Sequence, residues 1–269
     1  DNMALSMDYI RVMQRAQLIL HNHNQPNRVS TARTAKVQRP NSTYIDDVYQ
    51  LLNGGSINHD ALQVSLDKRF SNNYRFRVSY TLGNTRGNTR QGDAQSVYTQ
   101  VGGDLNLGSN WGPTDFDRRH NLVANTTIAV PGTGGLRVSG IMRLRSGARF
   151  SLIDSTLDTN RNGTANDEWL AAGTYSGSGT DSYTVNYDGG RNGGVGPKYF
   201  QLDGRAGYTL EMPNADTLEA YVDFINITNN SNFNAPSGDK RRASTYLILR
   251  TLVNNGLPRQ LQIGLRYAY

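Results

Sequence analysis

Apolar and polar residues alternate with a period of two along much of the chain. Between 74 and 82 the even positions carry apolar or aromatic side chains and the odd positions carry polar ones. The same alternation runs through 136–144 and 200–210, with Ile141 as an apolar residue on the polar side. A period of two is that of a β-strand with one apolar face, so the sequence predicts an all-β protein.

The alternating segments predict eight strands. Their expected ranges are about 1–12, 46–70, 74–88, 118–131, 136–153, 198–212, 217–229 and 258–269. These lengths exceed the 5 to 6 residues typical of soluble sheets and reach the roughly 9 to 11 residues that a tilted strand needs to cross a bilayer. The first residues already alternate, so we expect the chain to begin inside a strand.

Short and long connections follow one another between these strands. The short turns lie at 71–73, 132–135 and 213–216, and the long segments at about 13–45, 89–115, 154–197 and 230–257. Loops longer than about 12 to 15 residues are uncommon in compact soluble domains. Outer-membrane barrels have short periplasmic turns on one rim and long extracellular loops on the other. The layout therefore predicts a transmembrane antiparallel β-barrel, with the C-terminus on the periplasmic side.

The composition fits a barrel wall better than other classes of protein. The 269 residues are 36% hydrophobic and 19% charged, include no Cys, and carry a net charge of +6. No run approaches the roughly 18 apolar residues of a membrane helix, and the lack of Cys excludes thiolate metal sites. The basic residues are interleaved along the strands rather than gathered with stacking aromatics, so we expect no nucleic-acid partner. No catalytic pattern stands out, and no enzyme activity is expected.

Arginines occupy many of the polar strand positions. A narrow eight-stranded barrel would have to pair them with more carboxylates than the strands supply, whereas a wide hydrated lumen tolerates them. They are expected to pair with carboxylates of the wall and plug, the favoured interpretation, or to guide an anionic solute or bind lipopolysaccharide-like acids. The lumen-facing residues predicted in this way are Arg75, Arg77, Arg137, Arg143, Arg145, Arg205 and Arg266.

One segment of 154–197 matches part of a calcium-binding loop. Oxygen-bearing side chains stand at relative positions 1, 3 and 5, and Gly163 stands at position 6, where the chain must turn sharply. Position 12 is Trp169 instead of the usual Glu, so an earlier acidic residue would have to replace it. A plain polar turn is the alternative, since Asn-Gly is a turn signal by itself. The candidate calcium ligands are Asp158, Asn160, Asn162, Thr164, Asp167 and Glu168.

The C-terminal residues have the form of an outer-membrane assembly signal. A polar residue and a glycine precede two aromatic residues at alternate positions, the second of them terminal. A final strand with an aromatic lipid face can pair by its edge with the barrel assembly machinery. The alternative is an ordinary amphipathic strand. The residues of the predicted signal are Gln262, Gly264, Tyr267 and Tyr269.

Residues 44–269 resemble the C-terminal part of TonB-dependent outer-membrane transporters, in the branch with an N-terminal carboxypeptidase-regulatory-like domain. The stretches that carry the resemblance are Asn58 to Phe70, Ser79 to Thr81, Phe116 to Asn121, Arg145 to Phe150, Asp223 to Asn229, Asn232 with Phe233, and Pro258 to Leu265. Asp60 and Arg149 depart from the family pattern. The resemblance implies a 22-stranded barrel sealed by a plug, of which this chain supplies the last eight strands, without the plug and the earlier strands.

The resemblance also implies a function. Such a receptor, in the outer membrane of a Gram-negative bacterium, binds a scarce ligand with its extracellular loops. It passes the ligand inward when the TonB complex, acting through the plug, uses the proton-motive force. The expected partners are outer-membrane lipid, lipopolysaccharide, the TonB complex, the assembly machinery and an unknown extracellular ligand or protein. Two alternatives remain: a structural or adhesive barrel that moves no solute, and a secreted β-sandwich that is soluble without detergent.

Overall fold

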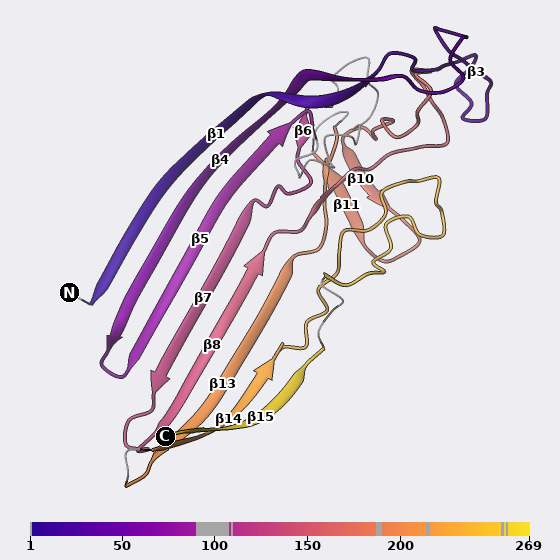
Figure 1. Cartoon of the computed structure of the whole chain (residues 1–269). Coiled ribbons are helices and arrows are strands. Elements are labelled where there is room, and N and C mark those ends of the chain that lie inside the picture. The colour runs from indigo at the N-terminus through magenta and orange to yellow at the C-terminus, as the bar shows by residue number, and fades with distance from the viewer. Residues whose placement is uncertain are drawn as a thin grey trace.

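Eight long strands form one antiparallel sheet (Figure 1). The computed structural model describes residues 2–89, 108, 110–186, 190–213, 216–253, 256 and 258–269. The strands are β1 (Met3–Asn22), β4 (Tyr49–Ser71), β5 (Tyr74–Gly87), β7 (His120–Ala129), β8 (Leu136–Arg145), β13 (Tyr199–Glu211), β14 (Thr217–Ile225) and β15 (Gln260–Ala268). Each pairs with the next along the chain, and the two-residue β6 (Gly112–Pro113) pairs with β5. The predicted all-β class and the eight successive strands are confirmed.

Three predicted strand ends were wrong, and one of them is that of β14, which ends at Ile225 instead of near residue 229. β1 continues to Asn22 instead of ending near residue 12, and its pairing with β4 shifts register between Gln14 and Ile19. Ala16 has a φ of 56° there. A bulge of this kind moves side chains to the other face, so the alternation breaks although the pairing continues. β8 ends at Arg145 instead of near residue 153.

The register gives the sheet one apolar and one polar face. Even-numbered residues of the six central strands lie opposite one another and opposite the odd-numbered residues of β1 and β15. The apolar face carries many large side chains that nothing covers. Those exposed on the two edge strands include Met3, Leu5, Met7, Leu261, Ile263 and Leu265. An apolar surface of this extent belongs against another apolar phase.

The sheet is open. β1 and β15 are its two edges, and no pairing joins them among the described residues. Figure 1 shows the two strands on opposite sides of a curved sheet. A closed barrel is therefore not formed by these eight strands in this structure.

The connections differ sharply between the two ends of the sheet. Short turns occupy one end, here called the turn end, and long connections occupy the other, called the loop end (Figure 1). The described long connections, 23–48, 88–89, 108, 110–119, 146–186, 190–198, 226–253, 256 and 258–259, are here called the loop layer. Most of the predicted loop at 89–115 lies outside the described residues. The layout of short turns and long loops otherwise agrees with the prediction.

The loop layer has secondary structure and a core of its own. Its small pairings are β2 (Asn27–Arg28) with β3 (Val37–Gln38), β9 (Arg149–Phe150) with β12 (Gly194–Val195), and β10 (Gly173–Ser176) with β11 (Ser182–Val185). A buried cluster lies among them, made of Phe150, Leu152, Tyr183, Val185, Tyr246 and Leu247. The largest buried hydrophobic cluster of the described chain thus lies beside the sheet and not on it.

The loop layer also covers the polar face of the sheet near the loop end. Ile57 and Ala61 on β4 and Thr85 on β5 occupy polar-face positions and are buried. The Thr85 backbone N–H donates to Asp117 Oδ1 at 2.8 Å, and Asp117 is itself buried. The loops therefore fold over the face opposite to the apolar one. Within the described residues, no helix is long and apolar enough to cross a membrane.

Candidate functional site

The strand register pairs several of the predicted lumen-facing arginines with carboxylates. Arg205 lies directly opposite Asp223, and Arg205 Nε is 2.5 Å from Asp223 Oδ1. In the same way Arg77 pairs with Asp67 and Arg266 with Glu219, while Arg143 reaches diagonally to Asp203. The corresponding distances are 2.9 Å for Arg143 to Asp203 and 3.6 Å for Arg266 to Glu219. These contacts agree with the structural pairing that the sequence favoured.

The remaining predicted arginines have other surroundings. The Arg145 guanidinium lies 4.9 Å from the centre of the Tyr199 ring, which stands opposite it in the register. Arg75 and Arg137 have no ion-pair partner in the part of the chain that the structure describes. The polar face therefore carries cations, carboxylates and aromatic rings in contact with one another, an arrangement that suits a hydrated interior.

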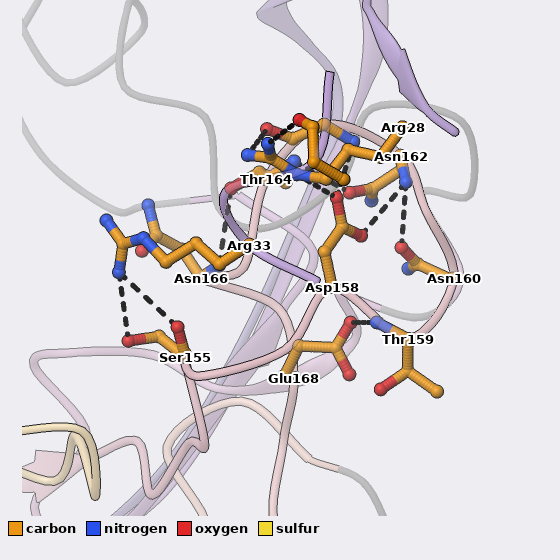
Figure 2. Close-up of polar contacts among 12 residues, drawn as sticks. Arg28, Arg33, Ser155, Asp158, Thr159, Asn160, Asn162, Thr164, Asn166 and Glu168 are labelled. Atoms are coloured by element: carbon orange, nitrogen blue, oxygen red, sulfur yellow. Dashed lines mark hydrogen bonds and ion pairs between the residues drawn. The ribbon is translucent and has the colours of Figure 1, made fainter. Parts of the chain in front are cut away.

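The predicted calcium loop closes around Asp158 (Figure 2). The Asp158 side chain is fully buried, and Arg28 Nε donates to its Oδ2 at 2.7 Å. The backbone N–H groups of Asn162 and Gly163 donate to the same carboxylate at 3.1 and 2.9 Å. Gly163 has a φ of +87°, and a Cβ there would lie 2.3 Å from Pro26 O, so only glycine fits this turn.

The other candidate calcium ligands lie in the same loop and accept hydrogen bonds from amide groups. Asn162 Nδ2 and Asn160 Nδ2 donate to Asp167 Oδ2 at 2.7 and 3.2 Å, and Glu168 Oε1 accepts from the Thr159 N–H. Thr164 Oγ1 accepts from the backbone N–H of Asn166 at 3.2 Å. No three His, Asp or Glu side chains of the described residues gather into a group that could hold a metal ion. Calcium binding stays a prediction, and the cation placed at Asp158 is the Arg28 guanidinium.

The four long loops are numbered in chain order, the first between β1 and β4, the second between β5 and β7, the third between β8 and β13, and the fourth between β14 and β15. Arg28 belongs to the first loop and Asp158 to the third, so the bond between them joins two loops. Gln25 Nε2 donates to Asn162 O at 2.8 Å, and the Arg28 N–H donates to Arg161 O at 2.9 Å. Figure 2 shows Arg33 reaching Ser155 on the other side of this junction, where Arg33 Nη1 lies 3.3 Å from Ser155 O. No pattern in the sequence indicated these pairs, because their partners are separated by more than a hundred residues.

Further contacts tie the third loop to the fourth. The Ile153 N–H donates to Gly238 O at 2.9 Å, and the Lys240 N–H donates to Ile153 O at 3.0 Å. Lys240 Nζ also lies 3.3 Å from Asp154 Oδ2. The pKa of Asp154 is held below its usual value. The main cause is a hydrogen bond from the Thr156 hydroxyl, and the charge of Lys240 adds to it, although partial burial acts in the opposite direction.

The third loop is tied to the second in the same manner. Arg149 Nε donates to the buried Asp117 Oδ2 at 2.8 Å. Asn192 Nδ2 donates to Asp115 Oδ1 at 2.7 Å, and Arg191 Nη2 to Thr89 O at 3.1 Å. The described parts of all four loops are thus joined through the third, and together they form one surface that could receive a ligand.

A polar cavity opens where the first and third loops meet. Its volume is about 310 Å³, and its lining includes Gln25, Arg39, Asp47, Asn162 and Asn166. Arg39 Nη1 donates to Asp47 Oδ1 at 2.7 Å, so the charged pair of the lining is already neutralised. The cavity offers amide donors and acceptors to a polar group of modest size.

The predicted assembly signal lies on the edge strand β15, except for Tyr269, which directly follows the last residue of that strand. Tyr267 and Tyr269 stand at alternate positions with ring centres 6.2 Å apart. Gly264 faces Tyr221 on the polar face, and a Cβ at Gly264 would lie 2.3 Å from Tyr221 Cζ. The glycine thus makes room for a ring that in turn supports the Arg205 guanidinium, 4.2 Å from the ring centre. Gln262 lies opposite Asp223.

Residues 1–262 match the model of a protein family described as the outer membrane beta barrel domain. The chain belongs to this family, and its place is the bacterial outer membrane. Among solved structures, it is similar to the outer membrane transporter YddB from Escherichia coli, with a TM-score of 0.49 and 10% sequence identity. The match covers 99% of this chain and 30% of that one, so the chain spans less than a third of the length of YddB. No curated protein matches the chain.

Proposed function

We propose that this chain is the C-terminal part of a TonB-dependent outer-membrane receptor that takes up a scarce ligand. The observation that carries the proposal is the open sheet with one apolar face, one arginine-rich face, and all long loops joined into one layer at one end. In the proposed receptor the loop layer binds the ligand outside the cell. The TonB complex then drives its passage by moving a plug in the lumen.

The open edges and the polar face support a wide barrel. β1 and β15 each leave one side unpaired among the described residues, as expected of a segment whose neighbours are further strands. A barrel of about 22 strands has a lumen that must be plugged. The arginine–carboxylate pairs of the polar face, such as Arg205 with Asp223, remain partly exposed here and suit a hydrated lumen.

The orientation and the partners belong to the same proposal. The loop end is extracellular and meets lipopolysaccharide, and the turn end with the C-terminus is periplasmic. The apolar face contacts lipid. The unpaired edge of β15, with Tyr267 and Tyr269, is the element that the assembly machinery recognises. No enzymatic step is assigned to the chain.

Gene deletion in the native bacterium tests the transport role. Strains lacking the receptor, lacking TonB, or lacking both are grown on a panel of single limiting nutrients. On at least one nutrient the two single deletions should cause the same defect, and the double deletion should add nothing. If loss of the receptor causes a growth defect on a nutrient and loss of TonB does not, the proposal is contradicted.

A structural or adhesive barrel is the alternative, and one observation favours it. The loop layer has its own buried core, with Leu152 and Leu247 at 1% and 0% exposure, and so presents a firm surface to a protein partner. In that case loss of the receptor should weaken envelope integrity or cell adhesion. Loss of TonB should then leave both properties unchanged.

A further inference from the structure

A short basic turn projects from the fourth loop on a rigid base. Lys240, Arg241 and Arg242 follow one another there and are exposed. The N–H of Tyr246 donates to Arg242 O at 2.8 Å, and Tyr246 and Leu247 are buried in the core of the loop layer. The backbone of the turn is therefore fixed while its cationic side chains remain in solvent. Such pre-organisation lowers the entropic cost of binding a ligand.

Two guanidinium groups from different loops meet at one buried hydroxyl. Arg241 Nε donates to Ser155 Oγ at 3.0 Å, and Arg33 Nη1 lies 3.4 Å from the same oxygen. Ser155 belongs to the third loop and is 1% exposed. Figure 2 shows the Arg33 guanidinium directed at Ser155. The first and fourth loops thus place cationic side chains around one hydroxyl group of the third loop.

The nearest carboxylate does not saturate these guanidinium groups. Asp239 accepts from Ser155 Oγ at 2.7 and 2.8 Å and from the Arg241 N–H at 3.1 Å. The Nε atoms of Arg241 and Arg242 lie 3.7 Å from Asp239 Oδ2, beyond hydrogen-bonding distance. Within the described residues the Arg242 side chain donates no hydrogen bond. N–H groups therefore remain available to an external acceptor.

The charges of the cluster do not cancel. Lys240 pairs with Asp154 at 3.3 Å, and Asp154 also accepts from Thr156. Arg241 and Arg242 share Asp239, and Arg33 is linked to this carboxylate only through Ser155, which donates to it. The cluster of four cationic and two acidic side chains keeps an excess of positive charge. An exposed excess of this kind attracts anions in a salt-dependent manner.

We propose that Arg33, Arg241 and Arg242 form an oxyanion site that takes phosphate or sulfate groups of a polyanionic extracellular ligand. The planar fork of arginine bonds two oxygens of such a group at once. The first and fourth loops supply three such forks within one small region of the surface, next to Ser155 of the third loop. This inference rests on the proposed function, in which the loop layer binds the ligand, and it names the chemical class of that ligand.

Binding to the purified intact receptor in detergent tests the site. The probes are inorganic tripolyphosphate, dextran sulfate and uncharged dextran, measured by calorimetry at low and high salt. The parent should bind one or both polyanions and not the neutral dextran, with an affinity that falls as salt rises. The Arg241→Gln/Arg242→Gln variant should bind at least tenfold more weakly, and Arg242→Gln alone, which breaks no hydrogen bond, should show part of this loss.

Arg250→Gln is the matched control, because Arg250 is an exposed arginine of the same loop with no ion pair among the described residues. Its affinity should stay within about twofold of the parent. Comparison of the two polyanions tells phosphate from sulfate recognition. Absence of polyanion binding at low salt, an unchanged affinity in the double variant, or an equal loss in the control would overturn the proposal. Because binding is measured without TonB, its failure is distinct from failure of the transport role.

Discussion

The sheet and the loop layer of this protein are stabilised in opposite ways. The sheet has a continuous ladder of paired strands, and large apolar side chains on its apolar face, such as Ile263 with 75% exposure, stay uncovered. The loop layer has little regular pairing but buries Leu152 and Leu247 almost completely. The difference reflects the solvent, because a lipid-facing wall needs no apolar core of its own while loops in water do.

The same contrast holds for ion pairs. In the sheet, the side chains of Arg205 and Asp223 are 40% and 20% exposed, and exposed pairs contribute little to stability. In the loop layer, the side chains of Arg28 and Asp158 are 14% and 0% exposed. Loss of one partner there leaves a buried charge, which is costly. Similar residue pairs therefore carry very different energetic weight in the two regions.

The largest effect is expected from Asp158→Asn. The change removes the charge that faces Arg28 and should destabilise the junction of the first and third loops by about 3 to 5 kcal/mol. Limited proteolysis of the purified protein should show faster cleavage in these loops, while heat-modifiable migration on gels reports an intact barrel. Asp67→Asn, which affects the exposed pair with Arg77 in the sheet, is the control and should change cleavage little.

The same variant tests the calcium prediction. If the loop binds calcium, millimolar Ca²⁺ should slow cleavage of the parent and not of Asp158→Asn. Equal cleavage of the parent with and without Ca²⁺ would remove the prediction and leave the Arg28 guanidinium as the cation of this loop. Slow cleavage of the variant would show that the buried pair does not hold the two loops together.

A smaller effect is expected in the sheet from Gly264→Val. The new side chain would overlap the Tyr221 ring, and overpacking of this kind costs about 1 to 3 kcal/mol. The fraction of folded protein in isolated outer membranes should fall. The double variant Gly264→Val/Tyr221→Ala should recover folding, because it removes the ring. A double variant no better folded than Gly264→Val would show that the glycine serves recognition of β15 rather than packing.

The regular part of the fold could be predicted from the sequence because its cause is local. Alternating side chains define both the strands and their faces, and turn residues mark the ends. The prediction failed where a local irregularity intervened. Around Ala16 the bulge interrupts the alternation, so the sequence predicted a loop from residue 13. The pairing of β1 with β4 nevertheless continues to Asn22.

The loop layer could not be predicted because its contacts join distant segments. Asp158 stood out as a ligand of a cation, yet nothing near it in the sequence indicated that Arg28 would supply the charge. Leu247 lies in a segment without periodicity, and Leu152 lies in the part of the predicted strand 136–153 that is loop in the structure. The burial of both depends on the meeting of the third and fourth loops. Lys240, Arg241 and Arg242 are adjacent in the sequence, but nothing near them indicates that Arg241 and Arg33 would converge on Ser155.

The smallest expected effect is an alkaline loosening confined to the loop layer. Burial raises the pKa values of Tyr183 and Tyr246 above their ordinary value near 10. Their neutral forms therefore favour the folded loops fully below about pH 10, and this contribution to stability is lost as the pH rises through the raised pKa values. The backbone pairing of the sheet has no group that titrates in this range.

Absorbance at 295 nm and far-UV circular dichroism, followed together above pH 10, measure this difference. Ionisation of the buried tyrosines should come late and be accompanied by faster proteolysis of the loops, while the β-sheet signal persists. Tyr246 Oη has no hydrogen-bond partner among the described residues, so Tyr246→Phe should remove one late step without weakening the loops. Loss of the β-sheet signal at the same pH as the tyrosine step would show that the loop layer and the sheet unfold as one unit.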